Sequence, residues 1–550
     1  MDSLSWFVKF RNPFDAGSGA LAWEPSFFTN ELEFYILAML TFLHARRHGG
    51  GYLWLWWTTV AHGLTVECVS YWAEPIDNFW HAQSTVMFFG AREPFHIMCL
   101  YPGYIYTAAI AAKRLGLDEL PCACATALLV VLFDIPYDIM GIKLLWWTWH
   151  DTDANIRDRH YNVPWTSYYF HITFAFAFCW INNRAKRRFV GVSGLHSRAE
   201  INAFPAEQRR RANSFSARVK VLTLTGIFSM PFGILQFVPG YHIFKDVFGV
   251  HAEVTTMALG AVYCSVVFCG LLRAAPHDVR KEGEKKEKET KSGKGSWHYD
   301  ECFLAMMLHF THYIVLVIAM NPAKMQVYGL HQPMGSAPGS SDAYSCDQTR
   351  NLTYPYPLTP AFAKIVRQLS GGLIHQREDD APFQDVTVWK RPYLCPGGEM
   401  MDEPVQSFDC AMSRAHPPQP GQQWYWLCGT GWENADGSTS SVEYRLVVIF
   451  VCLLGMNLYA IALCYPSTLY EQLLVKWSIP KYYFASPTQQ DANATFVEKR
   501  NDADDKSNIM AIESSLSLSS KKVVELRAML KRRGMRTVGR KAELIERLMQ

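Results

Sequence analysis

Charged residues are scarce in this sequence of 550 residues: they make up 19% of it, whereas 49% of the residues are hydrophobic. Such a chain is too apolar to be intrinsically disordered and too long to form one ordinary domain. HExxH, P-loop and GxSxG motifs are absent, as is the repeated HxxHH pattern of diiron desaturases. The first 20 residues lack an apolar run, so we expect no cleavable signal peptide. These absences direct attention to the long stretches from which charge is missing.

Nine segments are apolar and long enough, or nearly so, to be transmembrane helices, which need about 17–25 residues. They are residues 31–45, 51–72, 95–112, 121–142, 165–181, 221–238, 254–272, 302–320 and 446–465. The last four contain no charged residue, whereas the first is short and weak. The predicted fold is therefore all-α, a polytopic transmembrane bundle of about nine spans.

The basic residues indicate how this bundle is oriented. Lys and Arg cluster at residues 46–47, 113–114, 186–188 with 209–211, and 280–294. All these clusters fall on one side when nine spans alternate across the membrane. Because cytoplasmic loops carry the excess of Lys and Arg, we expect the N-terminus outside and the C-terminus in the cytoplasm or nucleoplasm. We expect the endoplasmic reticulum or nuclear envelope as the membrane, with the plasma membrane as an alternative.

This topology places the long loop of residues 321–443 outside. The loop holds Cys346, Cys395, Cys410 and Cys428, which could form two disulfides in any of three pairings. The alternative is an inverted topology with these cysteines reduced in the cytosol. The other ten cysteines lie in or beside apolar spans and are expected to be small hydrophobic residues. Asn351 lies in a glycosylation sequon, Asn-Leu-Thr, in the same loop.

The sequence is predicted to divide into seven parts. They are an outer segment (1–30), helices one to five with a polar cluster (31–184), helices six to eight with basic loops (185–320), the outer cysteine-containing loop (321–443), the last membrane helix (444–480), a solvated linker (481–514) and a C-terminal helical module (515–550).

Three carboxylates lie inside the second and fourth spans, where ionisable groups are costly and usually functional. Asp134 and Asp138 are four residues apart, so both face the same side of a helix, and Pro136 frees a backbone carbonyl there. Glu67 shares a span with His62. Such carboxylates could act as general acid and base.

Other interpretations of this polar cluster stay open. Arg92 or Lys143 could neutralise the two aspartates as buried ion pairs. The carboxylates and histidines could bind a metal, but no metal or cofactor is predicted. The tryptophan-rich runs 54–57 and 146–149 are more typical of membrane-interface belts than of substrate platforms.

The C-terminal module combines two apolar stripes with strong positive charge. Residues 521–550 carry ten Lys and Arg against three Glu, a net charge of +7. Val523, Leu526 and Leu530 form one helical stripe, and Leu544, Ile545 and Leu548 form another. The basic residues near the intervening turn include Lys531, Arg532, Arg533, Arg540 and Lys541. This arrangement suits a phosphate backbone.

These residues closely resemble the SAP motif, a helix–extension–helix module of about 35 residues. The matching positions are Glu525, Leu526, Arg527, Leu530, Arg533, Gly534, Met535, Gly539, Lys541, Leu544, Ile545, Arg547 and Leu548, with Met535 where the family has Leu. The resemblance implies binding to duplex DNA through backbone and minor-groove contacts. Anionic lipid, RNA or a protein partner are alternatives.

A second resemblance covers residues 55–180. Glu67, Asp134 and Asp138, then Trp147-Thr148-Trp149 and Tyr161-Asn162-Val163-Pro164, occur in the order seen in membrane carotenoid hydratases. That resemblance implies protonation of an alkene on a polyisoprenoid or lipid, followed by capture of water, with the three carboxylates as acid and base candidates. The ligand would bind among helices two to five.

Three functional hypotheses follow. The first is a multi-pass membrane protein that presents a SAP domain and tethers DNA, chromatin or an associated protein to the membrane. The second is an intramembrane enzyme acting on a polyisoprenoid or lipid. The third is a transporter that uses the polar cluster as an ion site, although no inverted repeat supports it.

The predicted orientation is tested by glycosylation. Glycosidase treatment should shift the wild-type chain on a gel but leave Asn351→Gln unshifted, because only the outer sequon meets the glycosylation machinery. The second sequon, at Asn493, is predicted to be cytoplasmic. A shift that disappears in Asn493→Gln would contradict the orientation.

Overall fold

The computed structural model describes residues 6–14, 25–72, 79–149, 159–192, 194–274, 299–328, 335–336, 350–353, 387–390, 426–432 and 440–464. The chain forms two compact units, Met1–Ile479 and Pro480–Gln550. All the described residues belong to the first unit. The predicted SAP module lies outside them.

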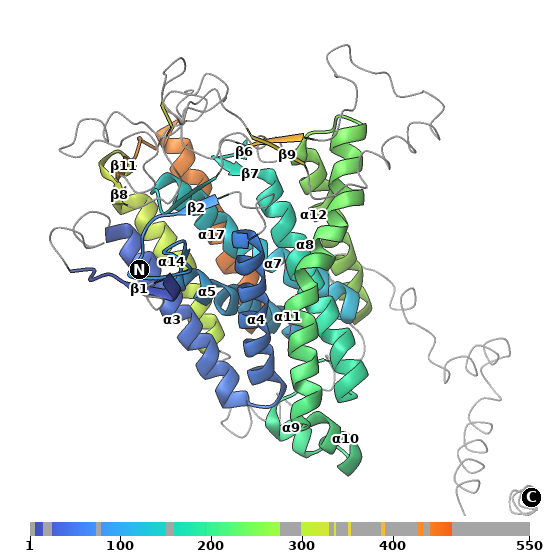
Figure 1. The fold of residues 1–550 in the computed structure, drawn as a ribbon. Coiled ribbons are helices and arrows are strands. Elements are labelled where there is room, and N and C mark those ends of the chain that lie inside the picture. Colours follow the sequence, from blue (N-terminus) through green and yellow to red (C-terminus); the bar gives the residue numbers. More distant parts are fainter. Residues whose placement is uncertain are drawn as a thin grey trace, which may run out of the picture. The chain divides into compact units, whose positions relative to one another are not determined.

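A helical element lies at each predicted span (Figure 1). These are α3 (Pro25–His48), α4 (Gly51–Trp72), α5 (Phe95–Tyr101) continued by the π-helical η2 (Pro102–Tyr106) and α6 (Thr107–Arg114), α7 (Glu119–Lys143), α8 (Trp165–Ala185), α11 (Phe215–Phe237), α12 (Ala252–Ala274), α14 (Glu301–Ala319) and α17 (Ser441–Cys464). Shorter helices are η4 (Lys186–Val190), α9 (Arg198–Asn202), α10 (Ala206–Ala212), η5 (Val238–Val247) and η6 (Pro322–Lys324).

Six of the described helical segments are long and apolar enough to cross a membrane: Phe95–Arg114, Glu119–Lys143, Phe215–Lys245, Ala252–Arg273, Glu301–Ala319 and Ser441–Cys464. These six fit an integral membrane protein. The helices α3, α4 and α8 fall short of the same standard, so the count of nine spans stays a prediction. The reason lies in composition. The helix α3 carries acidic residues, and α4 and α8 are rich in Trp, Tyr and His, which hydropathy scales rate far below Leu or Val.

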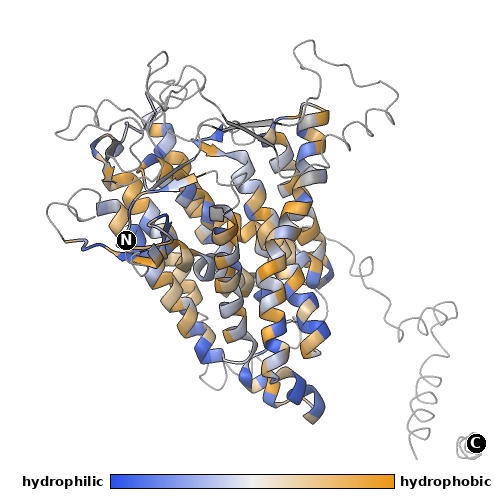
Figure 2. Cartoon of the chain, viewed as in Figure 1, coloured by the Kyte–Doolittle hydropathy of each residue, from blue (hydrophilic) through white to orange (hydrophobic). Residues whose placement is uncertain are grey.

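The six segments differ in how deeply they are buried. The most apolar window of Glu119–Lys143 is 67% buried, whereas that of Ala252–Arg273 is 28% buried and that of Ser441–Cys464 is 33% buried. Leu and Phe side chains on the less buried helices are strongly exposed, among them Phe450 at 65% and Leu235 at 64%. Figure 2 shows these helices largely in the colours of apolar residues, with hydrophilic residues gathered at α9 and α10. Such a surface is costly in water and favourable against lipid.

Short strands lie between and beside the helices (Figure 1). One sheet has the order β1–β3–β4 (Val8–Phe10, Val86–Phe88, Glu93–Pro94). The two-stranded sheets are β2–β5 (Phe79–His81, Trp147–Trp149), β6–β7 (Arg159–His160, Val163–Pro164), β8–β11 (Gln326–Tyr328, Trp426–Cys428) and β9–β10 (Arg350–Thr353, Thr387–Lys390). All pairs are antiparallel. Strands β6, β7, β8, β9 and β11 lie at the end of the bundle opposite α9 and α10, whereas β1 lies about half-way along it (Figure 1). Each strand lies in a segment predicted to be outside.

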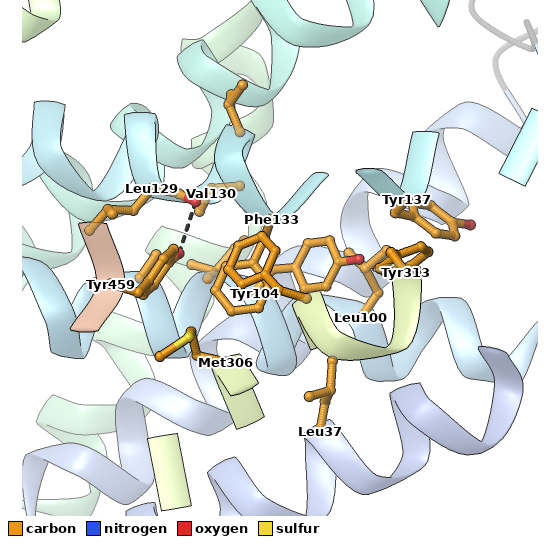
Figure 3. Close-up of a cluster of buried hydrophobic side chains, with 14 of the residues drawn as sticks. Leu37, Leu100, Tyr104, Leu129, Val130, Phe133, Tyr137, Met306, Tyr313 and Tyr459 are labelled. Carbon is orange, nitrogen blue, oxygen red and sulfur yellow. Dashed lines mark hydrogen bonds between the residues drawn. The ribbon is translucent and has the colours of Figure 1, made fainter. Parts of the chain in front are cut away.

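Aromatic side chains fill the core between α5–α6, α7, α14 and α17 (Figure 3). The ring centres of Tyr104 and Phe133 are 5.1 Å apart, and those of Phe133 and Tyr459 are 4.6 Å apart. The Tyr459 hydroxyl donates a 2.8 Å hydrogen bond to the backbone oxygen of Leu129. Burial of such rings is favourable, and the hydroxyl keeps a partner in a place without water.

A polar cluster of Asp300, Arg114 and His44 lies where the ends of three helices meet. Asp300 caps α14, accepting a hydrogen bond from the backbone nitrogen of Phe303, and is paired with Arg114 of α6. His44 of α3 lies 3.2 Å from the same carboxylate. Burial acts to raise the pKa of Asp300, but the hydrogen bonds and positive charge of His44 and Arg114 outweigh it and lower that pKa. This cluster therefore joins three helices at one end of the bundle.

The ten described cysteines are free, as expected for small hydrophobic residues in the spans. Cys346, Cys395 and Cys410 lie outside the described residues, and of Cys428 only its backbone in β11 is described. The predicted disulfides therefore stay a prediction. The glycosylation candidate Asn351 lies in β9, where its backbone pairs with Trp389.

The close contact of α14 and α17 is tested at Gly455. A Cβ atom at this position would lie 2.3 Å from the ring of Phe310. Gly455→Ala should therefore destabilise the bundle by about 1–3 kcal/mol through overpacking. Gly260→Ala on α12 is the matched control, because a Cβ there meets nothing within 4 Å. It should be neutral or stabilising by up to about 1 kcal/mol. Thermal unfolding in detergent checks both, and equal effects of the two changes would refute this packing.

Candidate carboxylate cavity

A cavity of about 200 Å³ lies among α4, α5–α6, α7, α8 and α11. Glu67, Asp134 and Asp138 all line it, so the structure brings the three predicted carboxylates together. The rest of the lining is mostly apolar and aromatic. Representative members are Val66, Ile97, Leu100, Tyr104, Val130, Phe170, Phe174 and Ile234.

Asp134 and Asp138 lie one turn apart on α7 and are 1% and 2% exposed. Pro136 stands between them inside the helix. Their side chains face α8, the neighbouring helix. The hydroxyl of Ser167 on α8 donates a 2.9 Å hydrogen bond to Asp138 Oδ2. One turn further along α8, His171 Nδ1 lies 3.1 Å from Asp134 Oδ2. The i, i+4 spacing of the aspartates is thus matched by an i, i+4 pair on α8.

Glu67 of α4 reaches the same cavity and is 5% exposed. The hydroxyl of Tyr101 donates a 2.5 Å hydrogen bond to Glu67 Oε1. Gly63 permits this contact, because a Cβ on Gly63 would lie 2.3 Å from the Tyr101 ring. The π-helical turn η2 begins just after Tyr101, and such turns are frequent at functional sites.

Glu93 in β4 stands behind Glu67 and was not identified as its partner in the sequence. The two carboxyl groups share a side-chain hydrogen bond, which requires one of them to hold a proton. Burial and the neighbouring Glu67 charge raise the pKa of Glu93 well above its usual value, although Arg92 opposes them. These effects favour the protonated form of Glu93.

The small sheet β2–β5 covers part of the cavity. Phe79, His81, Trp147 and Trp149 all line it, and Phe79 pairs with Trp149 while His81 pairs with Trp147. Trp147 is only 5% exposed. The expectation that residues 146–149 form an interface belt is therefore wrong for these two rings. A run of aromatic residues is suited both to the membrane interface and to the wall of a cavity. The pairing of β5 with β2 is what brings these two rings to the cavity.

The described lining of this cavity is poor in cations. It contains no Lys or Arg, and Lys143 of α7 instead lies 3.3 Å from the hydroxyl of Thr430.

Several polar atoms that line the cavity are buried without a hydrogen-bond partner. They are His81 Nε2, Tyr104 Oη, both oxygens of Asp134, Trp147 Nε1 and Trp149 Nε1. Because buried polar atoms are normally satisfied, this concentration indicates a cavity built to receive polar groups.

A second buried polar network joins α3 to α14 and was largely missed in the sequence. Glu33 Oε1 lies 2.7 Å from His309 Nδ1, and His309 Nε2 lies 2.8 Å from the backbone oxygen of Phe133. The Tyr313 hydroxyl donates a 2.9 Å hydrogen bond to Asn30. The clue was present at the start of the weak first span, where Asn30 just precedes the span and Glu33 lies within it, at helical spacing. Both His309 nitrogens are engaged, so this network serves to hold helices together.

The Glu67–Glu93 pair predicts a pH dependence of stability. A protein with an acid whose pKa is raised on folding loses stability as the pH rises from the pKa of that acid in the unfolded chain, about 4.3, toward its pKa in the folded chain. The thermal midpoint of the wild-type chain should therefore fall as the pH rises above about 5. Glu93→Gln should flatten that slope, because glutamine donates the same hydrogen bond at every pH. Identical slopes for the two chains would show that Glu93 does not hold the proton.

The comparisons with known proteins bear on both ends of the chain. A SAP domain model matches residues 517–550, which confirms the C-terminal SAP prediction. The basic residues Lys531, Arg532, Arg533, Arg540 and Lys541 lie within this match but outside the described residues. No curated protein and no solved structure matches the chain. The resemblance to carotenoid hydratases therefore stays a prediction.

A family model described as "Domain of unknown function (DUF7802)" matches residues 2–350. The match includes the helices and strands that line the carboxylate cavity. It covers more than half of the sequence, and the chain belongs to this family.

Proposed function

We propose that this chain is a multi-pass membrane protein whose cytoplasmic or nucleoplasmic SAP domain binds DNA or chromatin at the membrane. The observation that carries the proposal is the presence, in one chain, of six apolar helices long enough to span a bilayer and a SAP match at residues 517–550. A DNA-binding module fused to membrane helices holds its ligand at the membrane. The endoplasmic reticulum and nuclear envelope are the membranes that satisfy this requirement best.

The charge of the tail supports this proposal. The last 30 residues carry ten basic side chains against three acidic ones. Each phosphate neutralised by Lys or Arg releases counterions, so binding should weaken steeply with salt. Lys531, Arg532, Arg533, Arg540 and Lys541 are the residues proposed to contact the DNA backbone. Anionic lipid or a protein would engage the same charge but show no preference for a duplex.

DNA binding is tested with the full chain in lipid nanodiscs and a labelled duplex. Replacing Lys531, Arg532 and Arg533 together by Ala should lower affinity at least tenfold. It should also reduce the slope of log K against log salt by up to about three, since each contact contributes about 0.9. The matched control replaces Lys285, Lys286 and Lys288 in the other basic run. Equal loss in both variants, or equal affinity for heparin and duplex, would contradict a specific SAP–DNA contact.

A second candidate function is favoured by the meeting of Glu67, Asp134 and Asp138 in one largely apolar cavity. We propose that this cavity hydrates an alkene on a polyisoprenoid or lipid chain. The apolar and aromatic lining suits a hydrocarbon chain, and the carboxyl groups supply the polar chemistry.

The chemistry requires one proton donor and one site that holds water. Glu67 lines the cavity and would transfer a proton to one carbon of the double bond, and Glu93 behind it would then pass its own proton to Glu67. Aromatic rings, such as Trp147 and Tyr104, would face the resulting carbocation. Water held near Asp134 and Asp138 would add to the cation, and its surplus proton would pass to a carboxylate. The product would be a tertiary alcohol.

This candidate predicts a product that gains one molecule of water. Membranes containing the chain, given a linear polyisoprenoid in ¹⁸O-water, should yield the labelled alcohol by mass spectrometry. Glu67→Gln should slow its formation about 10²–10⁴-fold, the usual contribution of a general acid. Glu207→Gln on α10 is the control, because that carboxylate is exposed and bonded to Arg211. An unchanged rate in Glu67→Gln would reject the assignment of the proton donor.

A further inference from the structure

We propose that Asp134, Asp138 and His171 form a binding site for one divalent transition-metal cation, such as Mn²⁺ or Zn²⁺, on the wall of the carboxylate cavity. The sequence predicts no metal, because none of the established metal motifs is present. The site forms only when α7 and α8 are brought together.

The geometry of the three ligands carries the first step. One ligand atom from each residue lies within 4.8 Å of the other two. The closest measured pair, His171 Nδ1 and Asp134 Oδ2, is 3.1 Å apart. Two ligands at about 2.1 Å from a metal ion, 90–110° apart, are themselves about 3–3.5 Å apart. The Asp134–His171 pair already has this spacing, and a movement of the Asp138 side chain by about 1–2 Å would bring its carboxylate to the same ion.

The isolation of Asp134 from the rest of the protein is a second observation. This side chain is 1% exposed and lines the cavity, and its polar contacts are with the other two members of the site, Asp138 and His171. A buried carboxylate with so few partners is costly. His171 Nδ1 lies 3.1 Å from Asp134 Oδ2 and 2.9 Å from the backbone oxygen of Ser167. A cation held by Asp134 and Nδ1 would replace the hydrogen bond from Nδ1–H to Ser167, and the ring proton would then lie on Nε2.

Ser167 acts as a positioning residue for Asp138. Its hydroxyl donates a hydrogen bond to Asp138 Oδ2. Carboxylates that bind metals are usually hydrogen-bonded themselves, because such a bond fixes the orientation of the ligand.

The described residues contain one other cluster of three side chains that could bind a metal, His44, Asp300 and Cys302. The two clusters differ in the charge of their surroundings. In the other cluster Asp300 is already neutralised by Arg114. In the cavity no Lys or Arg belongs to the described wall, so no basic side chain there neutralises the two aspartates, and a divalent cation that displaces their protons would do so. Oxygen and imidazole ligands together suit first-row divalent metals.

This inference does not rest on DNA binding or on alkene hydration. If hydration occurs, the cation would hold the attacking water, and Glu67 with Glu93 would remain the proton donor. Metal binding is measured without DNA or lipid substrate, so its failure and the failure of either function are distinguishable.

The test uses the full chain in nanodiscs, stripped with a chelator and titrated with Mn²⁺ or Zn²⁺. We expect about one tightly bound ion per chain. For Mn²⁺, the electron spin resonance signal should show coupling to a nitrogen nucleus that disappears in His171→Ala. Asp134→Asn and Asp138→Asn should each weaken binding at least tenfold, and Ser167→Ala should weaken it about 10–100-fold, as supporting residues do. Cys302→Ser, in the other cluster, should leave binding unchanged.

Each variant is compared at matched thermal stability and elution volume, so that a misfolded chain is not mistaken for a lost site. The proposal is overturned if neither metal binds the wild-type chain. It is also overturned if folded Asp134→Asn and Asp138→Asn bind as tightly as wild type, or if Cys302→Ser loses the ion equally.

Discussion

Carboxyl groups buried among apolar helices must be neutralised, and much of this structure depends on how that is achieved. Glu67 shares a hydrogen bond with Glu93 and accepts another from Tyr101. Glu33 is held between two histidines of α14. Asp300 is paired with Arg114 and lies beside His44. Asp134 faces the cavity, and its polar contacts are with a second acid, Asp138, and with His171.

One set of helices holds the bundle together, and another set forms the cavity. Aromatic packing around Phe133 and the Glu33–His309 contact fasten α3, α7, α14 and α17 to one another. The cavity is made instead by α4, α5–α6, α7, α8 and α11, with β2 and β5 covering part of it. Because α7 belongs to both sets, its carboxylates are positioned by a helix that is rigidly packed on one side. Preorganisation of this kind is what a binding or catalytic site requires.

Sequence patterns predicted the helices and the SAP domain because each depends on local periodicity. The spacing of Asp134 and Asp138 likewise fixed their common face. Their partners could not be predicted, since His171 and Glu93 come from other elements whose rotation relative to α7 and α4 is set by packing. The role of Trp147 was mistaken for the same reason: its pairing with His81 is a contact across more than 60 residues of sequence. The weak hydropathy of α3, α4 and α8 also has a structural reason, because these helices carry polar and aromatic groups into the interior.

The central claim is that acids from α4, β4 and α7 meet at one cavity inside a membrane-embedded bundle. An electron cryomicroscopy map of the full chain in lipid nanodiscs tests it most directly. The account predicts Glu67 beside Glu93 and Tyr101, Asp134 and Asp138 beside His171, and density that is not protein between the aspartates and the histidine. Carboxylates that point apart, or that each pair with a lysine or arginine, would contradict it.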